Sequence, residues 1–313
     1  MPGSSSRISV TAKIAAYYRQ FSDITFAAEA AKCIDANGTF EQILSEHGLE
    51  REKLTFYAPM FEARYKSITE LIRKSGASQV LELASGYSLR GLDLTLARSI
   101  RYVETDLPEV IETKRGLLEE LRQQHGVGHT PGHVVTVADA LDAEQVRAAA
   151  AVLDHDEPLV VLCEGLIQYL SKEEVEVLAT NIRSLLREFA GGCWMTPDFA
   201  FKTEARDLPP ERVRLREAIA GVTQRQLEAA AFEDADELTG FLHRVGFHVV
   251  VRSQVDETPA FASIAALGLS PALLDRFRPV LRVWIMTPQT PPSAVTERQA
   301  LTRDHYSGRA DEA

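Results

Sequence analysis

The stretch QVLELASGYSLRGLDLTLARSIRYVETD, residues 79–106, determines the fold that we expect. Its apolar start, residues 80–83, is typical of a buried parallel strand. Residues 84–88 are mostly small, so their backbone N–H groups can approach a ligand closely. Leu92 and Leu96 lie about one helical turn apart and indicate that this turn leads into a helix.

A second strand, residues 101–104, follows that helix and leads to the carboxylates of Glu104 and Asp106. A strand, a small-residue turn, a helix and a strand with a terminal carboxylate about 20 residues on form the nucleotide-binding plan of a doubly wound sheet. We therefore expect Asp106, followed by Leu107, to hydrogen-bond ribose hydroxyls. Asp106 could also cap the helix that Pro108 opens.

The composition of this turn separates two classes of nucleotide-binding protein. Dinucleotide-dependent dehydrogenases carry G-x-G-x-x-G, whereas Ala84 occupies the first glycine position here. Glu82 lies inside the first strand, where methyltransferases commonly carry an acid and dehydrogenases an apolar residue. The sequence therefore favours S-adenosylmethionine over NAD, and a dehydrogenase is a distant alternative.

The composition is that of a soluble globular protein, with 45% hydrophobic and 25% charged residues. The 313 residues suit one large domain or one domain with a lid. A net charge of −11 without a basic cluster argues against nucleic acids and anionic membranes as partners. No apolar run approaches the roughly 20 residues of a membrane span, and the start lacks a secretory core. We therefore expect a cytoplasmic monomer or homodimer that acts on a small molecule.

Neither the cysteines nor the histidines indicate a metal site. The three cysteines lack metal-binding or disulfide spacing. His125, His129 and His133 are four residues apart, but the glycines and the proline among them preclude a regular helix. No G-x-S-x-G motif occurs, so a serine hydrolase has no support.

Beyond the organising stretch, helical periodicity dominates residues 10–74, and five further strands are expected, which makes seven in all. The expected fold class is α/β, a doubly wound, seven-stranded and mostly parallel sheet with an N-terminal helical cap and an inserted helical lid. The last strand, near residues 280–286, is expected to be antiparallel. The expected parts are a cap at 1–75, a cofactor-binding domain at 76–287, a lid within it at 201–245 and a disordered tail at 288–313.

Four motifs in order resemble one family. They are TAKIAAYYR (11–19), LELASGYSLRG (81–91), YVETDLPEVIETKRGLL (102–118) and CEGLIQYLSKEE (163–174). Together they resemble the leucine carboxyl methyltransferase family, which includes the tetracenomycin-type polyketide carboxyl methyltransferases of bacteria. The resemblance covers roughly residues 8–200 and implies a class I fold, S-adenosylmethionine as cofactor and methyl transfer to an oxygen.

The resemblance also assigns roles to individual residues. The implied cofactor contacts are Ala84 and Gly86 at the first turn, Asp106 and Leu107 at the ribose, Asp139 and Ala140 at the adenine, Glu164 at the methionine end, and the basic pair Lys13 and Arg64 at the cofactor carboxylate. Tyr169 would lie near the reacting methyl group. The turn departs from the family's G-x-G followed by Asp-Thr-Arg, although Arg90 keeps the arginine.

The acceptor is expected to be a carboxylate. An ionised carboxylate needs no general base, so catalysis would depend on alignment, exclusion of water and a cation such as Arg64 to hold the acid. Arg64 could otherwise be an ordinary solvated arginine, and Tyr169 a core aromatic. Two hypotheses remain: an O-methyltransferase of a small-molecule carboxylate, or a protein of the same fold that modifies or binds a protein partner at its C-terminal carboxylate. A hydroxyl acceptor is a further alternative.

Overall fold

A computed structural model describes residues 5–97, 100–205, 210–223 and 229–290. The core is a seven-stranded sheet in the order β3-β2-β1-β4-β5-β7-β6, in which only β7 runs antiparallel to its neighbours β5 and β6. This confirms the expected fold class. The strands are β1 (Gln79–Leu83), β2 (Arg101–Asp106), β3 (His133–Val137), β4 (Leu159–Cys163), β5 (Gly192–Thr196), β6 (Phe247–Ser253) and β7 (Arg282–Pro288).

Helices cover both faces of the sheet because the inner strands are apolar on both sides. On one face, α7 (Ala143–Ala150), α8 (Lys172–Leu186) and α11 (Ala235–Val245) share a core with Leu81 and Trp194. On the other face, α4 (Tyr57–Ser75) and α5 (Arg90–Ala97) pack against Val80 and Tyr102. A further helix, α6 (Pro108–His125), contacts β2 and β3.

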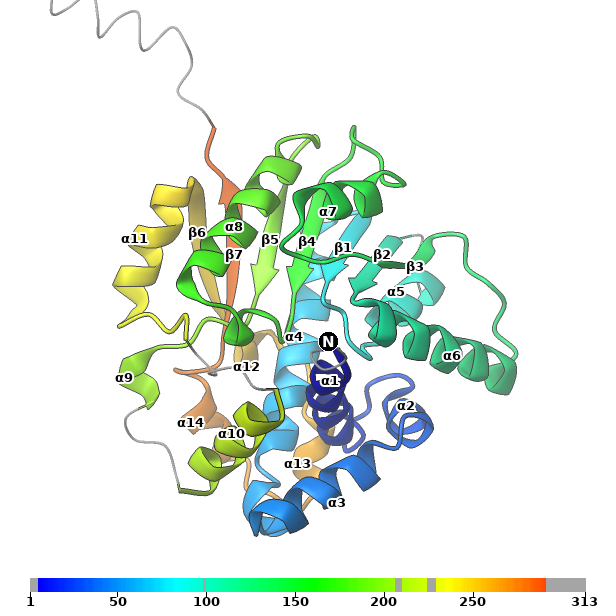
Figure 1. Ribbon diagram of the computed structural model, residues 1–313, viewed down its shortest axis with the longest axis vertical. Helices are drawn as coiled ribbons and strands as arrows, with labels where there is room; N and C mark the ends of the chain where they lie inside the picture. Colours follow the sequence, from blue (N-terminus) through cyan, green and yellow to red (C-terminus); the bar gives the residue numbers. More distant parts are fainter. Residues whose placement is uncertain (1–4, 98–99, 206–209, 224–228, 291–313) are drawn as a thin grey trace, which may run out of the picture.

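The N-terminal helices lie beyond the carboxyl ends of the parallel strands, to which the arrowheads point in Figure 1. They are α1 (Ser5–Arg19), α2 (Ala27–Cys33), α3 (Ala36–His47), the short 3-10 helix η1 (Arg51–Leu54) and the first part of α4. The second part of α4 buries Ile68 and Ile72 against the sheet. The helices of the range 1–75 are therefore continuous with the α/β core through α4.

The inserted segment after β5 is shorter than expected. Its helices α9 (Lys202–Ala205) and α10 (Pro210–Thr223) lie outside the sheet, and α10 contacts α1 and α3. In contrast, α11 buries Leu238 and Leu242 completely in the sheet core. The last part of the expected lid range, residues 235–245, thus packs on the sheet through the apolar stripe of α11.

A second insertion joins β6 to β7 and contains α12 (Gln254–Glu257), α13 (Ala262–Ala266) and α14 (Leu273–Phe277). Because β7 is antiparallel, this insertion returns the chain to the carboxyl edge of the parallel strands, where β7 begins. The expected tail begins where β7 ends, and residues 291–313 lie outside the described part of the chain. Within that part, no helix is long and apolar enough to cross a membrane.

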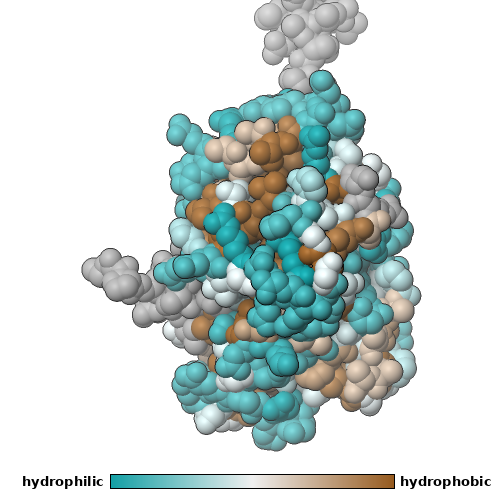
Figure 2. All heavy atoms as spheres, turned by 90° about the vertical axis from the view of Figure 1, so that its right-hand side faces the viewer, coloured by the Kyte–Doolittle hydropathy of each residue, from teal (hydrophilic) through white to brown (hydrophobic). Residues whose placement is uncertain are grey.

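The two edge strands are β3 and β6. On β3 only Val137 is exposed, and its other four residues are half-buried. Figure 2 shows the face at the β3 side of the molecule, where hydrophobic areas are interrupted by hydrophilic residues. The Arg115 side chain donates to the Val135 carbonyl over 2.8 Å and so occupies one backbone acceptor of β3, an arrangement that discourages strand pairing at this edge.

Candidate functional site

The turn after β1 brings backbone N–H groups to the carboxyl edge of the sheet. Ala84 and Gly86 both adopt positive φ angles, 53° and 52°, in the region that favours glycine. A Cβ atom on Gly86 would lie 3.3 Å from the Cβ of Ala12 on α1. The turn is anchored where the Ser85 amide donates to the Thr105 carbonyl over 2.9 Å. Small residues here let the chain turn tightly beneath α1.

Asp106, the last residue of β2, ties this turn to the start of α6. One carboxylate oxygen accepts from the Gly86 N–H and the other from the Leu107 N–H, both over 2.7 Å. Burial raises the pKa of Asp106, against the lowering effect of these two N–H groups. The N-cap residue of α6 is Leu107, with Pro108 in the first turn. Asp106 is therefore not the helix cap, and its side chain lies at a strand end.

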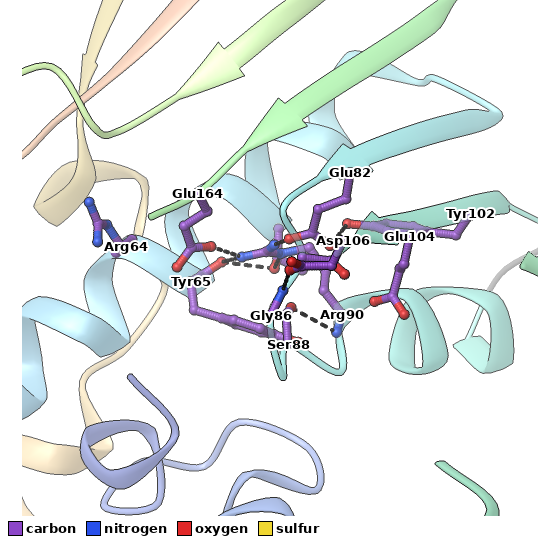
Figure 3. A network of polar contacts seen from close by, with 12 residues as sticks. Arg64, Tyr65, Glu82, Gly86, Ser88, Arg90, Tyr102, Glu104, Asp106 and Glu164 are labelled. Carbon is purple, nitrogen blue, oxygen red and sulfur yellow. Dashed lines mark hydrogen bonds and ion pairs between the residues drawn. The ribbon is translucent and has the colours of Figure 1, made fainter. Parts of the chain in front are cut away.

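Arg90, the first residue of α5, is fully buried and pairs with two carboxylates. Its guanidinium donates to Glu82 over 2.8 Å and to Glu164 over 2.6 Å. It also lies over the Tyr65 ring, 4.3 Å from the ring centre. Figure 3 shows Arg90 between the two carboxylates. Glu82 accepts a further hydrogen bond from the Tyr102 hydroxyl over 2.7 Å, so protein groups already satisfy both of its oxygens.

Glu164 follows β4 directly and binds a second arginine, Arg19 at the end of α1. The Glu164 side chain is only 4% exposed. Burial alone would raise its pKa, but the guanidinium groups of Arg19 and Arg90 outweigh burial and lower the pKa to about 2. Glu164 is therefore ionised at neutral pH. The Arg19 Nε atom is buried and has no hydrogen-bond partner among the described residues.

Arg64 on α4 pairs with Asp198, which follows β5. Their Nη2 and Oδ1 atoms are 2.7 Å apart, and the side chains are 19% and 0% exposed. The other oxygen of Asp198 accepts from the Leu166 N–H over 2.8 Å. Burial raises the pKa of Asp198, and Arg64 offsets this only in part. Figure 3 places Arg64 on the opposite side of Glu164 from Arg90, so a second cation lies near the end of β4.

Glu104 on β2 is the register partner of Glu82 and pairs with a different set of groups. It is fully buried, with Lys114 at 3.1 Å and the His133 ring at 2.9 Å. Burial alone would raise the pKa of Glu104, but Lys114 and His133 lower it to about 2. Lys114 also donates to the Ser85 hydroxyl over 2.9 Å. A Cβ atom on residue 91 would lie only 2.8 Å from His133 Nε2. The pairing of His133 with Glu104 therefore requires glycine at position 91.

The groups around Glu164 and Asp106 border a cavity of about 570 Å³. Its β3 end is lined by residues that follow β1, β2, β3 and β4, and its β7 end by residues after β5, in α9 and α10, and just before β7. Ten of the eleven predicted site residues line it: Arg64, Glu82, Ala84, Gly86, Asp106, Leu107, Asp139, Ala140, Glu164 and Tyr169. Segments far apart in the sequence thus meet at one edge of the sheet.

Lys13 is the exception, because it is not among the residues that line the cavity. The residues of α1 that line the cavity include Ala12, Ala15 and Arg19, whereas Lys13 does not line it. A helix places residues 100° apart, so the residue after Ala12 turns away from the face that Ala12 and Ala15 share. A basic residue of α1 does reach the site, but it is Arg19.

Two of the predicted residues, Asp139 and Tyr169, are less buried than Asp106 and Glu164. Asp139 is exposed, and its carboxylate accepts from the Leu141 N–H over 2.9 Å. Tyr169 ends the 3-10 helix η2 (Ile167–Tyr169) and is half-buried. Burial raises the pKa of the Tyr169 hydroxyl. Tyr169 is therefore a neutral hydroxyl at the cavity wall at neutral pH.

Three contributors were not predicted as site residues: Arg19, Tyr65 and Asp198. Arg19 closes the motif TAKIAAYYR, and its helical phase relative to Ala12 and Ala15 is a signal that the sequence contains. Asp198 follows a predicted buried strand, as Glu164 does, and the same strand-end rule points to it. The sequence offers no comparable signal for Tyr65, since its role depends on how α4 lies against α5.

Histidines take no part in the wall of the cavity. None is among the residues that the structure places along it, and His133 is bonded to Glu104 instead. Over the described ranges, no group of three or more histidine, cysteine, aspartate or glutamate side chains is arranged to hold a metal ion.

Comparison with known proteins agrees with this arrangement. The family model described as "Leucine carboxyl methyltransferase" matches residues 27–183. Two relatives, from Mycobacterium marinum and Mycolicibacterium gilvum, are provisionally named S-adenosyl-L-methionine-dependent methyltransferases. The first is 35% identical over 36% of this chain and 36% of its own length, and the second 29% identical over 63% and 62%. The matches thus span less than two thirds of these relatives.

A solved structure shares the fold. It is that of a protein from Thermobifida fusca, provisionally named a methyltransferase, with a TM-score of 0.51 and 17% identity over 89% of this chain and 95% of the other. At that identity the likeness concerns the fold alone. The family match covers just over half of the 313 residues and includes the ends of β1, β2, β3 and β4 that line the cavity. This chain belongs to the leucine carboxyl methyltransferase family.

Proposed function

We propose that this protein transfers the methyl group of S-adenosylmethionine to a carboxylate oxygen of a small, largely apolar acid. The observation that carries the proposal is the composition of one continuous cavity. Its β3 end presents the carboxylates of Asp106, Asp139 and Glu164, and its β7 end is rich in aliphatic and aromatic side chains. In a doubly wound sheet, ligands bind outside the carboxyl ends of the strands, and this cavity lies there.

The β3 end fits the cofactor chemically. Asp106 at the end of β2 would hold the ribose hydroxyls, and Asp139 with Ala140 would flank the adenine. Glu164, ionised and almost fully buried, suits the ammonium group of the methionine part. The Nε of Arg19, which has no hydrogen-bond partner among the described residues, is a donor for the carboxylate of that part. The cavity volume of about 570 Å³ is within the usual range for cofactor sites.

When bound, the cofactor supplies a methyl group on a positively charged sulfur, which an oxygen nucleophile attacks in line. The carboxylate oxygen forms a bond to the methyl carbon, the carbon–sulfur bond breaks, and sulfur retains the electron pair. The protein aligns the two reactants and excludes water. Arg64, steadied by Asp198, would hold the attacking carboxylate, and the neutral Tyr169 hydroxyl would lie beside it.

Two features support a carboxylate over a hydroxyl acceptor. A hydroxyl generally benefits from a base poised near the working pH, and no histidine is among the described residues that line the cavity. An acid that is ionised at neutral pH requires only a cation and an apolar environment. Both are present near Arg64, where Tyr57, Met60 and Phe61 also line the wall.

The cofactor is tested by calorimetry on the purified protein. We expect S-adenosylmethionine and S-adenosylhomocysteine to bind and NAD not to bind. A Glu164→Gln variant should bind both adenosyl ligands more weakly, whereas Glu188→Gln at an exposed ion pair outside the cavity should not. Clear heat with NAD, or none with either adenosyl ligand, would overturn the cofactor assignment.

The acceptor atom is tested chemically. The protein is incubated with methyl-labelled S-adenosylmethionine and a panel of apolar acids, and the products are treated with mild alkali. A methyl ester releases labelled methanol, whereas a methyl ether does not. Alkali-stable label would assign the reaction to a hydroxyl acceptor, and label on protein alone would favour a protein substrate.

A further inference from the structure

At the β7 end of the cavity the cation is Arg282, and its ion pair is more exposed than those of Arg19 and Arg64. Arg282 is the first residue of β7 and lines the cavity. Because β7 is antiparallel, its first residue lies at the same edge as the carboxyl ends of β4 and β5. The register pairs Thr196 with Trp284, so its continuation by two residues brings Arg282 level with Asp198. Arg282 therefore lies on the strand next to the one that leads to Asp198, beside the Arg64–Asp198 pair.

The backbone at this position is firmly fixed. The Gln254 side-chain amide donates to the Arg282 carbonyl over 2.9 Å, and the Gln254 N–H donates to the Leu281 carbonyl over 2.9 Å. The Arg282 guanidinium lies over the Phe201 ring, 5.5 Å from its centre. Phe201 is itself held by a backbone bridge to Phe232. The arginine is therefore presented to the cavity from a rigid base.

The partner of Arg282 is exchangeable, unlike those of Arg19 and Arg64. Its Nη1 atom lies 2.8 Å from Oε1 of Glu204 on α9, and the two side chains are 28% and 35% exposed. An ion pair this exposed typically contributes about 0–1 kcal/mol, so another carboxylate can replace Glu204 at little cost. By contrast, Arg19 and Arg64 bind carboxylates that are 4% and 0% exposed, which are costly to uncover.

The surroundings of Arg282 favour an apolar ligand with an acidic end. Leu281, Val280, Phe199 and Leu215 line the same part of the cavity. The planar fork of a guanidinium makes two parallel hydrogen bonds to a carboxylate, and these apolar side chains would contact the hydrocarbon part of such a ligand.

We infer that Arg282 binds a second acidic group of the methyl acceptor in place of Glu204, so that the preferred acceptor is an apolar dicarboxylic acid. One carboxylate would lie at Arg64 for methylation and the other at Arg282, with the apolar part between them. The inference rests on the proposed function for the carboxylate at Arg64, but the binding at Arg282 can be measured without turnover. Methylation would then yield a monoester that keeps one negative charge.

The test compares acids that differ only in the second carboxylate. Decanedioate and decanoate have chains of equal length, and they are titrated by calorimetry into protein saturated with S-adenosylhomocysteine. Dioates of 8 to 14 carbons, each with its monoacid, extend the comparison because flexible chains adapt to the separation of the two arginines. We expect the best dioate to bind roughly 5- to 10-fold more tightly than its monoacid, as for one charge-assisted pair.

Two variants change this preference in opposite directions. Arg282→Met should remove the advantage of the dioate and leave monoacid affinity unchanged. Glu204→Gln, which removes the competing carboxylate, should strengthen dioate binding by about 2- to 5-fold. The matched control is the exposed Arg147–Glu188 pair, at 2.7 Å but outside the cavity, where Arg147→Met and Glu188→Gln should change neither affinity.

Equal affinity of dioates and monoacids in the unaltered protein, or an equal loss of both in Arg282→Met, would overturn the assignment. Weaker dioate binding in Glu204→Gln would also overturn it, and this variant keeps the test informative if Arg282→Met does not fold. Failure of the proposed function has a different signature: dioates still bind in an Arg282-dependent way, but no alkali-labile methyl group is formed.

Discussion

At the β3 end of the cavity the carboxylates around Arg90 are buried and paired with it, whereas the Arg282–Glu204 pair at the β7 end is half-exposed and can change partners. Arg90 is fully buried between Glu82 and Glu164, while Arg282 and Glu204 remain accessible to solvent. Buried pairs are costly to disrupt and fix a geometry, and exposed pairs are weak and adaptable. The molecule thus places rigidity where an invariant cofactor would bind and adaptability where acceptors would differ.

The largest expected effect is at the centre of the rigid end. Arg90→Met leaves the carboxylates of Glu82 and Glu164 without their shared cation, and breaking such a buried pair typically costs about 3–5 kcal/mol. We expect the free energy of unfolding, measured with urea, to fall by that amount, and cofactor binding to be lost. Arg282→Met should cost less than about 1 kcal/mol. Similar losses at the two arginines would remove the distinction between the two ends.

Acid should destabilise the rigid end before any other part of the pairing network. The pKa values of Glu104 and Glu164 are lowered from 4.5 to about 2. A carboxyl whose pKa is lower in the folded state stabilises the protein above its unfolded pKa and loses that contribution as the pH falls toward the folded pKa. Stability should therefore decrease from about pH 4.5 toward pH 2, by up to on the order of 3 kcal/mol for each group.

The measurement is the urea midpoint at a series of pH values. Glu104→Gln should be less stable at neutral pH and should show a shallower loss below pH 4.5, because one of the two groups no longer titrates. Glu204→Gln, at the exposed pair, serves as the control and should leave the slope unchanged. A variant slope equal to that of the unaltered protein would show that the buried network does not govern acid stability.

A smaller effect is expected at Asp106. Asp106→Ala should weaken S-adenosylhomocysteine binding by about 1.5–3 kcal/mol, the cost of losing a charged hydrogen-bonding partner. Because Asp106 also holds the Gly86 N–H, part of this loss would come from the turn. Adenosine, which carries the ribose but not the methionine part, should lose a similar share of its affinity. Unchanged adenosine binding in a folded variant would leave Asp106 as a support of the turn alone.

Much of the rigid end could be predicted from the sequence because parallel strands end at one edge. Apolar runs followed by an acid located Asp106 and Glu164, and the cavity includes both. Sequence resemblance gives no helical phase, so it named Lys13, whereas the basic residue of α1 that pairs with Glu164 is Arg19. The pairing of Arg90 with Glu82 depends on tertiary contact and has no local signal.

The β7 end was less predictable for a physical reason. Its wall comes from insertions after β5 and β6, whose place depends on packing rather than on strand alternation. The helix α11 falls within the expected lid range, although Leu238 and Leu242 lie at helical spacing and fill the core. The sequence contains no local signal for Arg282, because its proximity to Asp198 arises only when β7 runs antiparallel beside β5.

The smallest expected effect concerns a strained residue in the first turn, and here the rigid end should gain stability. Ala84 has φ 53°, a conformation that costs an alanine about 1–2 kcal/mol but costs glycine almost nothing. Ala84→Gly removes this strain, although the unfolded chain gains entropy that opposes the benefit. We expect the free energy of unfolding to rise by roughly 0.5–1 kcal/mol.

The matched control is Ala148→Gly in α7, an exposed helical position, where the same substitution should lower stability by about 1 kcal/mol. Opposite signs at the two alanines would identify backbone strain as the cause, whereas a loss of stability at both would mean that Ala84 is not strained in the folded protein.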